Sequence, residues 1–217
     1  MNLFKTSIGK KILMALSALF LIVFLIQHFL INITSTFDKE LFNFLSHFMG
    51  TNFLVQFLFQ PILITGVIFH FVMGFILEYK NQNSTQYKNI KSMHKKNSLW
   101  ISRNMIISGL AILSFIILHF IDFWIPEINY KYINNYLPDP DRYYVELSHK
   151  FDNLARVIVY CISFVFLSLH LLHGFRSSIK SLGFSIHSTR FITVVTVSYS
   201  ILIPLGFCFI AVFHYLY

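Results

Sequence analysis

Charged residues are scarce in this sequence, and long apolar runs take their place. Only 12% of the 217 residues are charged and 56% are hydrophobic, with 26 phenylalanines. A soluble domain carries about 25% charged residues, so the composition predicts an all-α integral membrane protein. The formal net charge of +8 does not indicate nucleic-acid binding, because the basic residues gather in loops beside apolar runs. That arrangement is typical of the positive-inside rule of membrane proteins.

Several chemical motifs are also missing. The only cysteines, Cys161 and Cys208, lie in apolar runs, and an ordinary iron–sulfur cluster needs four. The absence of C-x-x-C-H excludes covalently attached c-type haem, and the absence of H-E-x-x-H excludes that class of zinc protease. No acidic residue is expected near a membrane midplane and no lysine inside a span. A proton-coupled transporter or a retinal protein is therefore disfavoured.

Five apolar runs are long enough to cross a bilayer, which takes about 20 helical residues. The first run is too long for a signal peptide and lacks an A-x-A cleavage site. No internal repeat is visible, and residues 1–217 are expected to form one domain. Pro61 and Pro204 are expected to kink their helices. The predicted helices are 12–33, 53–78, 101–125, 152–175 and 190–215.

The basic residues in the loops predict how these spans are oriented in the membrane. Twelve lysines and arginines fall on the side of the N-terminus and four on the other, so the N-terminus is predicted to be cytoplasmic and the C-terminus external. The expected location is a bacterial cytoplasmic membrane. The outer loops 34–52 and 126–151 are expected to hold short amphipathic elements at the membrane surface. In the first of them the apolar residues at helical spacing are Leu41, Phe44, Leu45 and Phe48.

Four histidines lie inside four different runs, where each is energetically costly: His28, His70, His119 and His170. At about 1.5 Å per helical residue, His28 and His119 lie about 25 and 24 Å from the cytoplasmic face. By the same measure, His70 and His170 lie about 12 and 9 Å from it. The depths predict an inner pair, His70 with His170, and an outer pair, His28 with His119.

Bis-histidine ligation of a haem requires this arrangement, with one imidazole from each of two helices on opposite faces of a porphyrin. A glycine follows four residues after His70 and after His170, where it leaves room for a flat macrocycle. The competing interpretation is that such histidines only form hydrogen bonds between helices. His173 is the alternative ligand to His170. Surface roles are expected for the remaining histidines: His47, His94, His149, His187 and His214.

The stretches around these histidines resemble a known family. They are IQHFLIN (26–32), SHFMGTN (46–52), HFVMG (70–74), SRNM…LHFIDFW (102–124) and HLLHGFRS (170–177). Over nearly the whole chain they resemble the cytochrome b membrane-anchor subunit of succinate:quinone oxidoreductases. The resemblance is to the single-chain, five-helix, two-haem type, also called the cytochrome b558 subunit.

This resemblance implies that the four histidines ligate two stacked b-type haems within a five-helix bundle. It also implies partners, a flavoprotein and an iron–sulfur subunit docked on the cytoplasmic side. Electrons would pass between succinate or fumarate at the flavin and a quinone, often menaquinone, in the membrane. In the direction of succinate oxidation this is a step of the tricarboxylic acid cycle. The basic inner loops would form the docking face, or serve only as topology determinants.

One departure concerns proton transfer. Some family members carry a glutamate two residues before the last haem ligand, where this chain has Ser168. That proton route is therefore not expected here. The chain has no dinucleotide fingerprint, so the isolated chain is not expected to oxidise succinate, and its chemistry is electron relay and quinone binding.

Further candidate residues follow from charge and topology. Haem propionates need cationic or hydroxyl partners. The inner candidates are Ser17, Ser102, Arg103, Arg176 and Lys180, and Arg156 is an outer one. The family resemblance implies a quinone at the outer end, where the topology places Asn32, Asp122 and Trp124, although an interfacial anchor is the preferred interpretation of Trp124. The alternatives are a two-haem anchor of a hydrogenase or nitrate reductase, and a transporter without haem.

Overall fold

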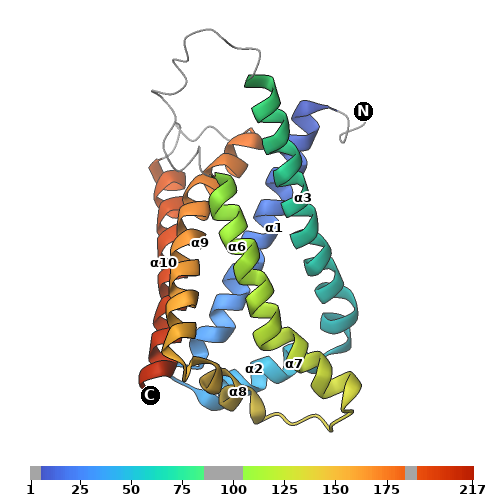
Figure 1. Ribbon diagram of the computed structural model, residues 1–217, viewed down its shortest axis with the longest axis vertical. Helices are drawn as coiled ribbons and strands as arrows, with labels where there is room; N and C mark the ends of the chain where they lie inside the picture. Colours follow the sequence, from blue (N-terminus) through green and yellow to red (C-terminus); the bar gives the residue numbers. More distant parts are fainter. Residues whose placement is uncertain (1–5, 86–104, 184–189) are drawn as a thin grey trace.

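Five long helices form an elongated bundle in the computed structural model, which describes residues 6–85, 105–183 and 190–217 (Figure 1). Each of the five is long and apolar enough to cross a membrane, which confirms the prediction of a multi-pass helical protein. α1 begins at one end of the bundle, here called the N-side, and α10 ends at the other, the C-side. The long α-helices are α1 (Ser7–Thr34), α3 (Gln60–Thr85), α6 (Met105–His119), α9 (Leu154–Ser181) and α10 (Arg190–Leu216).

Local sequence signals explain where these helices begin. Thr6 caps α1 by accepting a hydrogen bond from the backbone N–H of Gly9 at 3.0 Å, so the helix starts earlier than residue 12. Asn153 caps α9 in the same way, accepting from Ala155 at 2.9 Å. Such caps satisfy N–H groups that have no partner inside the helix.

The third span is longer than predicted. After α6 the helical path continues through η2 (Phe120–Trp124), α7 (Ile125–Ile128) and η3 (Asn129–Ile133), where η denotes π-helix. The span therefore ends at Ile133 instead of residue 125. Pro126 does not end the span, because it follows directly on the π-helical turn η2 and the helical path passes through it into α7. Another π-helical turn, η1 (Val55–Phe59), leads into α3.

Two short helices lie across the C-side end of the bundle, α2 (Lys39–Thr51) and α8 (Arg142–Phe151) (Figure 1). They occupy the two loops in which amphipathic elements are expected. Asn43 joins them: its amide donates to the carbonyl of Asp141 at 3.1 Å and accepts from the N–H of Tyr144 at 2.8 Å. In α2 the inward residues are Phe42 and Asn43, while the predicted apolar stripe at Leu41, Phe44 and Phe48 is exposed.

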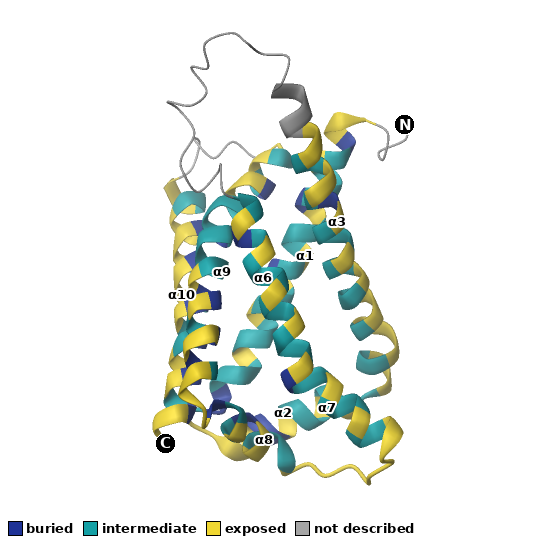
Figure 2. Ribbon diagram, viewed as in Figure 1, coloured by how far each residue is buried: buried dark blue, intermediate teal, exposed yellow. Residues whose placement is uncertain are grey.

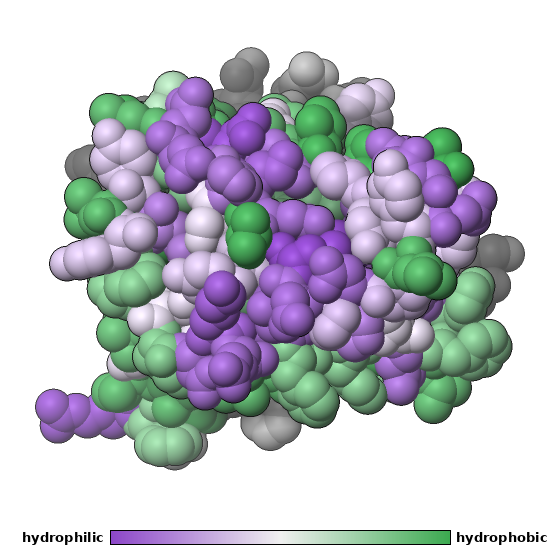
Figure 3. Space-filling model, turned by 90° about the horizontal axis from the view of Figure 1, so that it is seen from below, coloured by the Kyte–Doolittle hydropathy of each residue, from purple (hydrophilic) through white to green (hydrophobic). Residues whose placement is uncertain are grey.

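The tightest packing lies between α9 and α10 and against the C-side helices (Figure 2). Phe164 and Phe207 stack there with ring centroids 5.4 Å apart, and Tyr160 packs edge-on against Phe151. α3 packs mainly against α1. The outward faces of the spans are apolar, as lipid contact requires. Seen from below, the C-side end carries many hydrophilic side chains over its middle and upper part, with hydrophobic side chains among them and along the lower edge (Figure 3).

Candidate functional site

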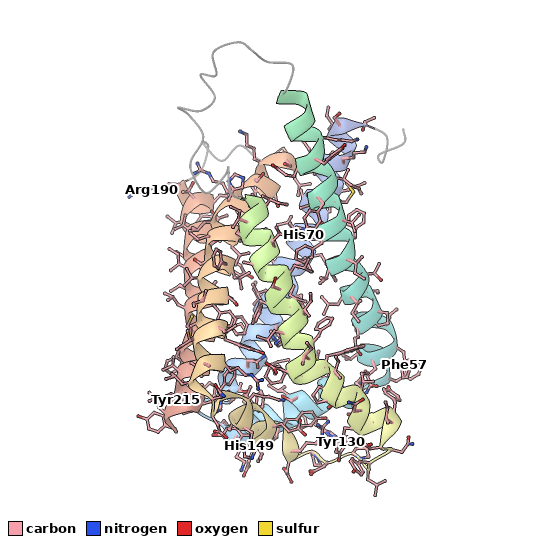
Figure 4. The ribbon with its side chains drawn as sticks, viewed as in Figure 1. Phe57, His70, Tyr130, His149, Arg190 and Tyr215 are labelled. Carbon is pink, nitrogen blue, oxygen red and sulfur yellow. The ribbon has the colours of Figure 1, made fainter. Side chains whose placement is uncertain are left out.

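Two pairs of histidines face each other inside the bundle. On the N-side, the ring centroids of His70 (α3) and His170 (α9) are 6.4 Å apart, with the ring planes at 69°. On the C-side, those of His28 (α1) and His119 (α6) are 5.8 Å apart at 87°. Figure 4 shows His70 among the helices of the N-side half. These are the pairs that depth along the spans predicts, and His170, not His173, faces His70.

Two serines lie beside the N-side pair, each within hydrogen-bonding distance of Nδ1 of one histidine. Ser17 Oγ of α1 lies 3.1 Å from Nδ1 of His70, and Ser108 Oγ of α6 lies 3.2 Å from Nδ1 of His170. Each serine hydroxyl also donates to a methionine carbonyl three residues earlier, at 2.9 Å. Ser17, a candidate propionate contact on sequence grounds, thus lies against a histidine ring.

The C-side pair lies in an aromatic enclosure. Phe24 stacks on His28 at 5.5 Å between centroids, and Phe115 lies 5.8 Å from His119. Phe123 also approaches His119 at 5.1 Å. Within the described part of the chain, Nδ1 of His119 is buried without a hydrogen-bond partner, and Nδ1 of His28 lies 3.5 Å from the amide nitrogen of Asn32. The two pairs therefore differ in their polar surroundings.

The four helices that carry these residues form two similar halves. The pattern M-x-x-S followed by ten residues and H occurs in α1 (Met14, Ser17, His28), and it occurs again 91 residues later in α6. The pattern H-x-x-x-G occurs in α3 and again in α9. Each half supplies one histidine to each pair. This local repeat is spread over four separate helices, and it corrects the expectation that the chain has no internal repeat.

The repeat sets the spacing of the two levels. Ser17 and His28 are eleven residues apart on α1, and Ser108 and His119 are eleven apart on α6. At 1.5 Å per residue the two pairs lie about 16 Å apart along the helix axes.

The glycines of the repeat allow close packing between helices. A Cβ placed on Gly174 would lie 3.2 Å from Cε of Met105, and one placed on Gly74 would lie 3.6 Å from Cε of Met14. The methionines of one motif therefore lie against the glycines of the other.

A buried carboxylate lies one turn beyond His119. The Asp122 side chain is 2% exposed, accepts a hydrogen bond from Tyr160 Oη at 2.8 Å, and lies 3.4 Å from Arg156. Asp122 also borders a pocket of about 260 Å³ at the C-side, together with Phe123, Pro126, Glu146, His149 and Lys150. Arg156, expected near a propionate, is thus placed beside Asp122.

The remaining predicted site residues are dispersed. Asn32 donates to the backbone carbonyl of His28 at 2.8 Å. Trp124 Nε1 is buried without a partner, and its ring lies against Phe120 at 5.6 Å. Asn32, Asp122 and Trp124 share the C-side half, and the structure joins no two of these three by a hydrogen bond. Arg176 and Lys180 are exposed at the N-side end of α9. Ser102 and Arg103 lie outside the described residues.

A network of ion pairs lies at the C-side end of the bundle. Glu127 of α7 pairs with Lys131 and with Arg142, and Arg142 also pairs with Glu146 at 2.7 Å. The Arg142 guanidinium lies over the ring of Tyr143 at 4.3 Å. Burial, followed by the charge of Glu127, raises the pKa of Tyr143 to about 12. This network ties α8 to the extension of the third span.

Two histidines expected at the surface are not free surface residues. His214 is 4% exposed, and its Nε2 lies 2.9 Å from Ser35 Oγ while its Nδ1 lies 3.1 Å from Ser148 Oγ. The expectation was wrong because α8 folds back over the end of α10. His47 has a buried Nδ1 and packs against Tyr143. His149 is exposed, and His94 and His187 lie outside the described residues.

The described residues contain no group of three or more His, Cys, Asp or Glu side chains that could hold a metal ion by themselves. The histidines occur as pairs instead. No protein-family model matches the chain, and no match is found among curated proteins or solved structures.

Proposed function

We propose that this chain is the di-haem cytochrome b anchor of a succinate:quinone oxidoreductase, relaying electrons between an iron–sulfur subunit and membrane quinone. The observation that carries the proposal is the pair of facing histidine couples inside the bundle. Each couple takes one imidazole from each of two helices, and the couples lie at two levels along the helix axes.

The residues fit a haem on geometric grounds. Two imidazole nitrogens that bind one metal from opposite sides, at about 2 Å each, place their ring centroids about 6 Å apart. The separations here are 5.8 and 6.4 Å. A large angle between the ring planes is compatible with this, because both rings can stand edge-on to a plane between them while rotated about their common axis. A porphyrin would supply the other four ligands of the metal. A haem therefore needs two histidines from the protein and not a larger cluster of ligating side chains.

A bound b-type haem supplies reversible one-electron transfer. The four histidines would hold it, and the rings of Phe24, Phe115 and Phe123, which pack around the C-side pair, would shield that pair from water. The alternative of purely structural histidines is weakened because the four histidines occur as two pairs, each built from two different helices.

The C-side half supports a quinone site. A quinone needs hydrogen-bond donors and proton-exchanging groups beside apolar walls. The pocket at Asp122 and Phe123 offers a buried carboxylate next to an apolar ring, and Trp124 offers a buried N–H without a protein partner. Menaquinone is the quinone proposed, on the strength of the family resemblance.

The N-side end is proposed to face the bacterial cytoplasm and to dock the iron–sulfur and flavoprotein subunits. The exposed cations Arg176 and Lys180 at the end of α9 are suited to an acidic partner surface. Co-purification tests the partner: recovery of a flavoprotein that oxidises succinate supports the proposal. Recovery of a hydrogenase or nitrate reductase would contradict it.

The deciding experiment is haem quantification on the full-length chain. Purified wild-type protein is expected to give a b-type reduced-minus-oxidised spectrum with about two haems per chain. His170→Ala is expected to lose one haem, whereas the matched control His173→Ala, one turn further on the same helix, is expected to keep both. A folded, haem-free wild-type protein would overturn the proposal.

A further inference from the structure

The hydrogen bonds of the N-side pair fix which nitrogen of each imidazole can bind a ligand. Ser17 Oγ has a single hydrogen, and the structure directs it to the carbonyl of Met14 at 2.9 Å. The same oxygen lies 3.1 Å from Nδ1 of His70. Because the hydroxyl hydrogen is already used, the bond to the histidine forms only if Nδ1 carries the proton and donates.

The second serine repeats the arrangement. Ser108 Oγ donates to the carbonyl of Met105 at 2.9 Å and lies 3.2 Å from Nδ1 of His170. Serines in helices commonly donate to the preceding turn, so the carbonyl bonds alone indicate nothing. Two serines at equivalent positions of a repeated motif, each also aligned on Nδ1 of a histidine from another helix, indicate a shared role.

We infer that Ser17 and Ser108 are positioning residues, which hold His70 and His170 as Nδ1–H tautomers and so keep Nε2 of each ring available to a ligand between them. This inference rests on the proposed function for the identity of the ligand, and on the hydrogen-bond geometry alone for the tautomer. A histidine that ligates a metal characteristically donates its other ring N–H to a nearby acceptor.

The inference reassigns Ser17. Its hydroxyl donates to the carbonyl of Met14 and accepts a hydrogen bond from Nδ1–H of His70. Because both bonds are already formed, a propionate is not its expected partner. It also predicts an asymmetry between the two levels. On the C-side, no serine among the described residues aligns on His28 or His119, and Nδ1 of His119 has no hydrogen-bond partner among them. Removing the serines is therefore expected to change the N-side centre alone.

The first test measures the tautomer without any haem. Full-length apoprotein labelled with ¹⁵N-histidine is compared with Ser17→Ala and Ser108→Ala. At neutral pH the wild-type His70 and His170 are expected as Nδ1–H forms, and each variant is expected to shift one of them toward the Nε2–H form. Ser114→Ala is the matched control, because Ser114 on α6 donates to Leu110 but contacts no histidine.

The second test measures haem retention in the same variants. Removing a supporting hydrogen bond of this kind typically weakens metal binding about 10–100-fold. Ser17→Ala and Ser108→Ala are each expected to release the N-side haem more easily by that factor, with the C-side haem unchanged. Ser17→Thr, which keeps the hydroxyl, is expected to restore retention.

The outcomes separate the two proposals. If the wild-type chain binds no haem but the tautomers shift as expected, the positioning role stands and the haem function fails. If the variants retain the wild-type tautomers, or if Ser114→Ala weakens haem retention as much as Ser17→Ala does, the positioning role is overturned.

Discussion

The imidazole of His28 lies 5.8 Å from that of His119, measured between ring centroids, and the two residues occupy equivalent positions of one repeated motif. Each has a phenylalanine four residues earlier, Phe24 or Phe115, that lies against its ring. On the N-side, His70 and His170 likewise occupy equivalent positions of a repeated motif, with ring centroids 6.4 Å apart. A bundle built from two such halves presents histidines in facing pairs, which is the geometry on which the proposed electron relay depends.

The two levels are expected to be separable by mutation. His70→Ala should remove the N-side haem and His119→Ala the C-side haem, because each variant leaves the other pair intact. Redox titration of the remaining haem in each variant measures this, and two different midpoint potentials are expected. Identical residual potentials in both variants would contradict the pairing.

The hydrogen bond from Tyr160 to Asp122 is expected to stabilise the C-side half. Tyr160→Phe leaves the buried carboxylate with only Arg156 at 3.4 Å, and should lower the free energy of unfolding by about 1–3 kcal/mol. Thermal unfolding in detergent measures the change. Tyr199→Phe is the comparison, because Tyr199 donates to the neutral carbonyl of Ile22 and its loss should cost about 0.5–1.5 kcal/mol. A loss of stability in Tyr160→Phe equal to or smaller than the loss in Tyr199→Phe would contradict this prediction.

His214 is expected to hold the end of α10 to α1 and α8. His214→Ala leaves Ser35 and Ser148 without their shared partner in a buried position, and should cost about 1–3 kcal/mol of stability. His149→Ala, on the exposed face of α8, should change stability by no more than about 0.5 kcal/mol. Chemical unfolding of both variants in the same detergent is the measurement. A His214 variant as stable as the His149 variant would show that the buried contacts contribute nothing.

The raised pKa of Tyr143 predicts a loss of stability at high pH. Below the ordinary tyrosine value of about 10 the residue is neutral in both the folded and the unfolded chain, so its contribution is fully present. Between about 10 and the folded value of about 12, only the unfolded chain loses the proton, and stability falls. Midpoints of thermal unfolding across this range should fall less steeply in Tyr143→Phe. Equal slopes in the variant and the wild type would rule out this contribution.

Much of the architecture follows from residues close together in the chain. Runs of apolar residues determined the spans. Backbone groups in lipid must form their hydrogen bonds within the protein, and a run of this length does so as a helix. Helical rise then placed His28 level with His119 and His70 level with His170. The end of the third span could not be read in this way, because a proline usually ends or kinks a helix, whereas the helical path here passes through Pro126 directly after a π-helical turn.

The sequence by itself determined that the chain is helical, that it has several spans, and at which depth each histidine lies. Only the tertiary structure decided which atoms meet: that His170 and not His173 faces His70, that Ser17 and Ser108 lie on imidazoles, and that Arg156 lies beside Asp122. The physical reason is that depth depends on distance along one helix. A contact depends on the rotation of two helices about their axes, which the packing of distant segments sets.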